Sequence, residues 1–154
     1  MLDVVSVTQM LAGAVRQASQ LNQGATLHYG KAFTVEIGFD RRRTEWRKIA
    51  PFAVFAPLGE EKADGARLHS VGLLLGVVDE QVLEQPVPML RGFSFIAQQA
   101  VPQAMKAMQN VVPALLPRCT LHDPTLEFVQ DEGPLLFCNI ALTIEESLPI
   151  GGRR

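Results

Sequence analysis

The chain has 154 residues, a length that fits one domain, and its 47% hydrophobic and 19% charged residues are ordinary for a globular protein. A net charge of −2 excludes the strongly basic field typical of nucleic-acid binders. Its uncharged stretches are too short to span a bilayer, and its two cysteines are too few for a disulfide scaffold.

We predict a single domain over residues 1–150 and a flexible tail at residues 151–154, where two glycines precede two arginines. The opening residues lack the positive region of a signal peptide, so we expect folding in a reducing cytosol and no membrane partner.

The first predicted element is a helix over residues 4–21, where apolar side chains recur at helical spacing and Gly24 follows as its terminator. A strand follows, because Phe33, Val35, Ile37 and Phe39 alternate with polar residues.

Two further strands are expected after a charged stretch. Pro51 and Pro57 flank the strand predicted over residues 49–56, and since proline donates no ladder hydrogen bond, we place this strand at a sheet edge. Residues 59–67 are predicted to form a polar loop. The apolar run 68–78 predicts a strand covered on both faces.

The second half of the chain predicts a helix and a hairpin. The helix spans residues 94–112, with Ser94 as its N-cap and Pro102 either kinking it or marking its first turn. The hairpin pairs residues 125–130 with residues 135–145. The fold class is therefore α+β: two layers, with two helices on one face of a largely antiparallel mixed sheet of about five strands.

Signatures of catalysis are scarce. The chain has no glycine-rich phosphate-binding motif. Cys119 and His122 form the one local cluster that could bind a metal or activate a thiolate, and His28 or His69 would have to join them, because zinc needs three or four ligands. Cys138 alternates with apolar residues and is predicted to be a core residue. We therefore predict no catalytic, cofactor-binding or metal-binding residues.

The most informative polar segment is residues 40–48, where five cationic and two anionic side chains surround the only tryptophan. Three interpretations are open: a loop that contacts single-stranded nucleic acid, a protein-contact hot spot, or a solvated arm with the tryptophan folded onto the sheet. The acidic stretch at residues 60–64 offers a complementary surface, so neighbouring copies could join head to tail and close into a ring. The predicted interface residues are Arg41, Arg42, Arg43, Trp46, Arg47, Lys48, Glu60, Glu61 and Asp64.

The layout of the chain resembles the tail terminator proteins of long-tailed, lambda-like bacteriophages. The resemblance extends over about 140 residues and lies in the order and residue pattern of the elements, not in a short motif. The opening helix and the stretches 33–40, 69–79 and 139–146 carry it. It implies a homo-oligomer, a hexameric ring that caps the finished tail tube, stops its polymerisation and presents a surface to the head–tail connector. It also implies a protein assembled in the bacterial host cytoplasm and located in the virion at the tail–head junction, with DNA passing through the ring lumen.

Two alternatives remain beside the tail terminator. One is another neck, head–tail connector or tail-completion protein, which would cap heads rather than tubes. The other is a small enzyme or ligand-binding domain that uses Cys119 and His122, for which zinc analysis and thiol titration are the direct tests. Fold alone does not decide among them, because one architecture hosts many functions.

Overall fold

The computed structural model describes residues 2–38, 45–131 and 133–149, and the predicted tail at 151–154 lies outside them. The elements in chain order are α1 (Val4–Arg16), α2 (Ser19–Tyr29), β1 (Thr34–Ile37), α3 (Trp46–Ile49), β2 (Phe52–Ala63), β3 (Ala66–Val78), β4 (Val82–Leu83), β5 (Met89–Leu90), α4 (Arg91–Phe95), the π-helix η1 (Ile96–Ala100), α5 (Val101–Leu115), β6 (Cys119–Leu121), β7 (Thr125–Gln130) and β8 (Leu135–Ser147).

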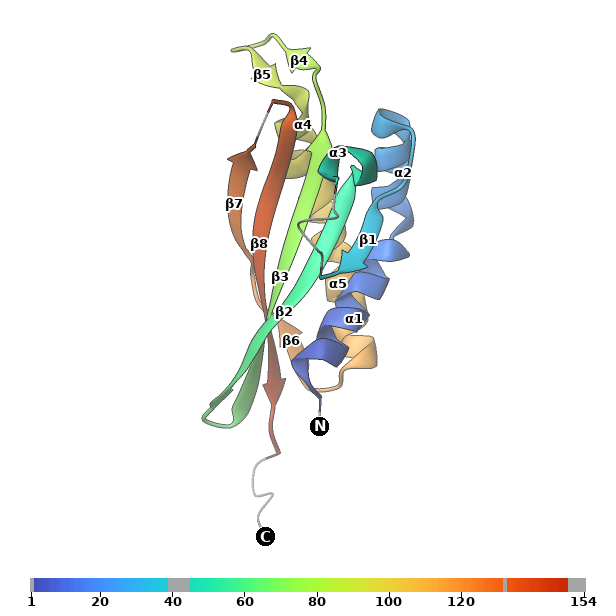
Figure 1. Ribbon diagram of the computed structural model, residues 1–154. Helices are drawn as coiled ribbons and strands as arrows, with labels where there is room; N and C mark the ends of the chain where they lie inside the picture. Colours follow the sequence, from blue (N-terminus) through green and yellow to red (C-terminus); the bar gives the residue numbers. More distant parts are fainter. Residues whose placement is uncertain (1, 39–44, 132, 150–154) are drawn as a thin grey trace.

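The predicted α+β class is confirmed: two helical segments, α1–α2 and α4–η1–α5, lie on one face of a curled mixed sheet (Figure 1). The strand order is β1-β2-β3-β8-β6, and β7 also pairs with β8. Strands β6 and β7 share the same edge of β8, because β6 pairs with its C-terminal end and β7 with its first half. Among the strand pairs of the described residues, β1–β2 alone is parallel.

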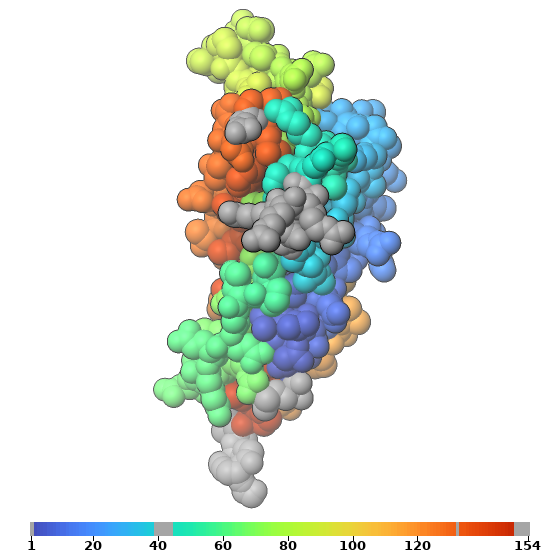
Figure 2. Space-filling view, in the orientation of Figure 1, coloured from blue at the N-terminus to red at the C-terminus, as the bar shows by residue number. Residues whose placement is uncertain are grey.

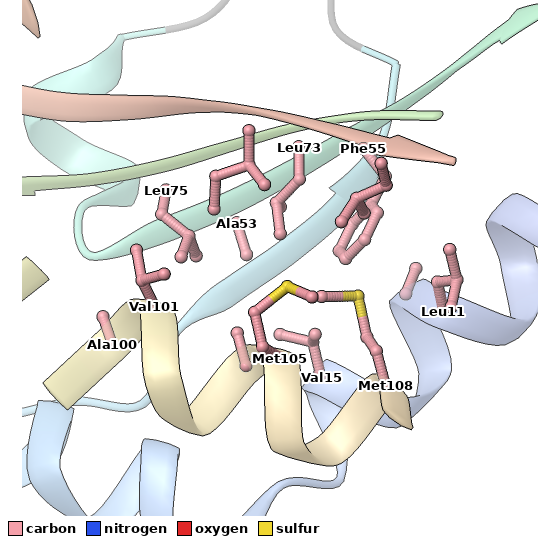
Figure 3. Packing of buried hydrophobic residues seen from close by; sticks show 14 of the residues in the cluster. Leu11, Val15, Ala53, Phe55, Leu73, Leu75, Ala100, Val101, Met105 and Met108 are labelled. Atoms are coloured by element: carbon pink, nitrogen blue, oxygen red, sulfur yellow. The ribbon is translucent and has the colours of Figure 1, made fainter. Parts of the chain in front are cut away.

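The main core lies between the helices and the sheet. Leu11 and Val15 of α1 and Met108 of α5 meet Phe55 and Leu73 of the sheet, and all five are at most 2% exposed (Figure 3). Burial of such side chains supplies the dominant stabilising term of the fold. Cys138, also fully buried, belongs to this core, as the alternation of β8 predicts.

The first helix is shorter than predicted, because the chain breaks after Arg16 and continues as α2. Asp3 caps α1 by accepting a 2.7 Å hydrogen bond from the Ser6 amide. At the break, the side-chain amide of Asn22 donates to the carbonyl oxygens of Val15, Arg16 and Ala18, and so links the end of α1 to the start of α2.

The predicted terminator of this helix is also wrong. Gly24 lies inside α2, and the helix ends instead at Gly30, whose φ of +81° lies in the left-handed region that glycine adopts readily.

The predicted edge position of the second strand is wrong. Strand β2 lies between β1 and β3, and its prolines are tolerated for local reasons. Pro51 precedes the strand, and Pro57 lies at a register shift beyond the end of the β1 pairing.

The predicted polar loop at residues 59–67 is instead the tip of a long hairpin. Strands β2 and β3 stay paired up to Ala63 and Ala66, with Asp64 and Gly65 as a two-residue turn. Gly65 has φ +70°, and an Asp-Gly pair is a strong hairpin signal that the alternation-based analysis missed. The apolar strand predicted at 68–78 is confirmed within β3, but its predicted coverage on both faces is wrong: Leu73 and Leu75 are buried under the helices, whereas Gly72 and Leu74 on the other face are only partly buried.

The second long helix begins earlier than predicted. Ser94 lies inside α4 rather than at its N-cap, which is Leu90. Pro102 lies in the first turn of α5, as one of the two predicted alternatives has it, and the π-helical turn η1 comes directly before α5. The helix continues past Pro113 to Leu115. The hairpin of β7 and β8 is confirmed, whereas β6 was not predicted.

Candidate interface on the open sheet face

The face of the sheet opposite the helices carries an apolar groove of 840 Å³. Its floor is formed by β3 and β8, with Trp46 of α3 and residues of β2 on one side and residues of β7 on the other. Glu127 and Asp131 are the acidic residues that line it. Figure 2 shows the β2–β3 hairpin and the β4–β5 hairpin projecting at opposite ends of the molecule.

Trp46 lies over the sheet at one end of the groove. Its ring centroid is 4.7 Å from that of Phe52, and the two belong to a second, smaller apolar cluster with Val54 and Leu135. The tryptophan is therefore folded back onto the sheet while part of its surface remains accessible. This position agrees with the interpretation of a solvated arm whose tryptophan is folded onto the sheet. Because part of the Trp46 surface stays accessible, the position is also compatible with a protein-contact hot spot.

The cationic neighbours of Trp46 are exposed on α3. Lys48 forms a 2.8 Å ion pair with Glu45, and Lys31 donates to the Lys48 carbonyl oxygen at 2.8 Å. The Arg47 guanidinium lies beside the β7–β8 turn. A Cβ atom added to Gly133 in this turn would be 3.2 Å from Arg47 Nη2. The three predicted interface residues Arg41, Arg42 and Arg43 lie outside the described residues.

The acidic residues of the predicted interface are at the far end of β2 from Trp46. Glu61 and Asp64 are exposed near the tip of the β2–β3 hairpin. Glu60 is folded back: its Oε1 accepts a 2.6 Å hydrogen bond from the Val4 amide, and its Oε2 lies 3.5 Å from Arg67. The structure thus separates the basic and acidic groups along one chain, and it gives Glu60 an internal role.

A buried polar cluster at the base of this hairpin was missed by the sequence analysis. His69 is fully buried between Glu60 and Glu146, with its Nε2 3.1 Å from the Glu146 carboxylate. Its Nδ1 lies 3.8 Å from Glu60 and has no hydrogen-bond partner. Recognising the Asp64-Gly65 turn would have placed Glu60 opposite His69 by simple counting along the hairpin.

A buried carboxylate, Asp79, lies at the opposite end of β3 from His69. Asp79 accepts hydrogen bonds from the Tyr29 hydroxyl at 2.7 Å, from Arg91 Nε at 2.9 Å and from the Gln81 amide at 3.0 Å. Burial acts to raise the pKa of Asp79, but the hydrogen bonds from Arg91 and Tyr29 outweigh it, so the net pKa lies below the ordinary value. The pKa of Tyr29 is raised, first by burial and then by its bond to Asp79. Three hydrogen bonds already engage the Asp79 carboxylate, so we interpret its ion pair with Arg91 as structural.

The structure does not bring Cys119 and His122 together in one site. Cys119 is 8% exposed and packs in the main core, whereas the side chain of His122 is 42% exposed and lies 3.0 Å from Glu145. Burial raises the pKa of the Cys119 thiol, and the negative charge of Glu146 raises it further. A raised pKa keeps the thiol protonated and unreactive at neutral pH. Within residues 2–38, 45–131 and 133–149, no group of three His, Cys, Asp or Glu side chains could hold a metal ion.

Comparison of the sequence with models of known protein families gives no match, and curated protein sequences give none either. Among the described residues, no helix has the length and apolarity needed to cross a membrane.

Proposed function

We propose that this protein is a structural tail terminator of a long-tailed bacteriophage. In this role several copies form a ring, six by the family resemblance, that caps the tail tube, stops its polymerisation and offers a joining surface to the head–tail connector. The protein assembles in the host cytoplasm, resides in the virion at the tail–head junction and leaves a lumen through which DNA passes.

The observation that carries the proposal is the β2–β3 hairpin, which extends beyond the helical layer (Figure 1). From Glu61 to Gly65 every residue is exposed, so the tip of the hairpin buries almost nothing in its own chain. Ordering such a segment costs conformational entropy, and an isolated two-stranded ribbon is marginally stable in water. Contacts with other chains would offset that cost.

The open sheet face supports the same role. Its groove is lined largely by aliphatic and aromatic side chains, and Leu58 beside it is 64% exposed. Exposed apolar surface of this kind marks sites of contact with other molecules. A protein that holds a neighbour on one face and a tube or connector on the other needs such surfaces and needs no reactive pocket.

Native mass spectrometry and negative-stain electron microscopy of the purified chain test the proposal first. We expect a closed ring with a central lumen, and addition of the protein to growing tail tubes should halt their elongation. A monomer at every concentration that also fails to bind tubes would contradict the proposal. Binding to filled heads instead of tubes would favour the alternative of a head–tail connector.

A further inference from the structure

The sheet ends in β1 on one side and, on the other, in β7 together with the shorter β6. Strands β1 and β7 are each paired with a single neighbour among the described strands, β1 with β2 and β7 with β8. An unpaired strand edge presents free backbone donors and acceptors, and it readily accepts a further strand.

Each of the two strands carries one charged side chain, Glu36 in β1 and Glu127 in β7, but neither carries the lysines or prolines that most often protect an edge. Thr34–Ile37 and Thr125–Gln130 contain no lysine, arginine or proline. Apolar side chains on these strands are exposed instead: Ile37 is 42% exposed, and Leu126 and Phe128 are each 41% exposed. Monomeric proteins rarely leave such edges open, because they template association.

The directions of the two strands are compatible with antiparallel pairing between copies. Strand β1 is parallel to β2, and each step from β2 through β3 and β8 to β7 is antiparallel. Strands β1 and β7 therefore point in opposite directions. A rotation about an axis along the strands preserves these directions, so β7 of one copy would meet β1 of the next in antiparallel orientation. A contact between two different edges is heterologous and can close into a ring.

The hydrogen bonds within the sheet identify the residues of β7 whose backbone groups point outward. Asp131 donates to the Leu135 carbonyl oxygen across the hairpin. Backbone groups alternate in direction along a strand, so Leu126 and Phe128 direct theirs away from β8.

The same alternation applies to β1. The amides of Thr34 and Gly38 donate to carbonyl oxygens at the two ends of the β2 pairing. Val35 and Ile37 therefore direct their backbone groups away from β2.

Charge and proline content select one register among those that keep the outward-facing residues opposite each other. Pairing Ile37 with Leu126 would place Glu36 opposite Glu127, and pairing Ile37 with Gln130 would place Glu36 opposite Asp131. Like charges directly opposite each other are destabilising. Pairing Val35 with Leu126 would place Ile37 opposite Pro124, which has no amide to donate.

We propose that copies of this chain join edge to edge, with β7 of one copy antiparallel to β1 of the next and Ile37 opposite Phe128. In this register Glu36 faces Val129 and no like charges meet. The two exposed apolar side chains cover each other on the helical side of the sheet. The inference rests on the proposed ring and specifies how its neighbouring subunits make contact.

Cysteine cross-linking tests the register. Hydrogen-bonded antiparallel partners lie about 5.5 Å apart at Cα, within the range that a disulfide spans. The double variant Ile37→Cys with Phe128→Cys should form a ladder of covalent multimers under oxidation, and reductant should dissolve it. Ile37→Cys with Leu126→Cys is the matched control and should cross-link far less; the native cysteines, both buried, serve as background.

A proline variant provides a second measurement. Phe128→Pro removes an outward amide without removing a bond to β8, so its secondary structure by circular dichroism should persist while assembly is lost. A disulfide-linked dimer of Phe128→Cys alone would indicate that β7 pairs with itself and would overturn the proposal, as would stronger cross-linking of the Leu126 control.

The outcomes separate this inference from the proposed function. Wild-type rings that show no cross-link in the double variant overturn the edge pairing and leave the tail-terminator role standing. Cross-linked multimers that fail to cap tubes support the edge pairing and reject the role. A monomer up to the highest soluble concentration overturns the edge pairing.

Discussion

At the scale of single residues, the buried His69 has the most consequential environment in the described part of the chain. It joins the hairpin to β8 through Glu146 and lies beside Glu60, which in turn holds the first amide of α1. Three elements distant in sequence therefore depend on one side chain. Polar groups buried in this way are costly to leave unpaired.

Replacing this histidine should destabilise the protein. His69→Ala leaves a cavity and an unpaired Glu146, and we expect a loss of about 2–4 kcal/mol in the free energy of unfolding. Ser70→Ala, on the opposite face of the same strand, is the control and should cost about 0.5 kcal/mol or less. Urea denaturation measures both, and equal losses for the two variants would refute the special role of His69.

Ile140, 1% exposed on β8, offers a purely apolar comparison. Ile140→Ala should cost about 2–5 kcal/mol, because the core closes only partly around the cavity. Asn139→Ala on the exposed face of the same strand should change stability by about 0.5 kcal/mol. Thermal unfolding followed by circular dichroism distinguishes them, and a loss below about 1 kcal/mol for Ile140→Ala would mean that the site collapses.

At the scale of elements, Asp79 joins the end of β3 to α2 through Tyr29 and to α4 through Arg91. These bonds position the β4–β5 hairpin, which the Gln81 carbonyl also ties to the Arg91 amide at 2.8 Å. Ionised Asp79 is favoured by the fold, since its pKa lies below the ordinary value.

Stability should therefore depend on pH through this carboxylate. A lowered pKa in the folded state contributes stability above the unfolded value of about 3.9, and this contribution disappears as pH falls through the still lower folded value. Asp79→Asn should cost about 1–3 kcal/mol near pH 7, because charged hydrogen bonds are lost. The difference between the variant and wild type should narrow below about pH 4. Urea denaturation of both proteins between neutral and acid pH measures this difference in the free energy of unfolding. A difference that widened in acid would contradict the stabilising role of ionised Asp79.

At the scale of the whole molecule, assembly should depend on residues that contribute little to folding. Glu61 and Asp64 are exposed at the hairpin tip, and their own chain gives them no buried contact. Their charges suit the basic segment that the sequence places at residues 41–48.

The double variant Glu61→Ala with Asp64→Ala should keep its stability within about 0.5 kcal/mol and lose assembly. Glu80→Ala with Glu84→Ala, an equally exposed acidic pair outside the hairpin, is the matched control and should assemble normally. Analytical ultracentrifugation compares the two, and normal assembly of the hairpin variant would show that its tip is merely solvated. Arg41→Ala with Arg42→Ala and Arg43→Ala should likewise leave stability within about 0.5 kcal/mol and weaken assembly.

The sequence alone determined the features that depend on local periodicity. A continuous apolar run identified β3 and alternation identified β8, the β7–β8 hairpin followed from its turn residues, and Cys138 was assigned to the core. These predictions succeed because a side chain's position in a strand or helix repeats with a short, readable period. The α+β class follows from the order of such segments.

Tertiary structure alone decided which strands neighbour each other and which polar groups meet. It placed β2 inside the sheet and brought Glu146 of β8 against the buried His69. It also separated Cys119 from His122, which are three residues apart in sequence. Such outcomes depend on partners far along the chain, and on backbone hydrogen bonds that every residue except proline can make, so no local pattern records them.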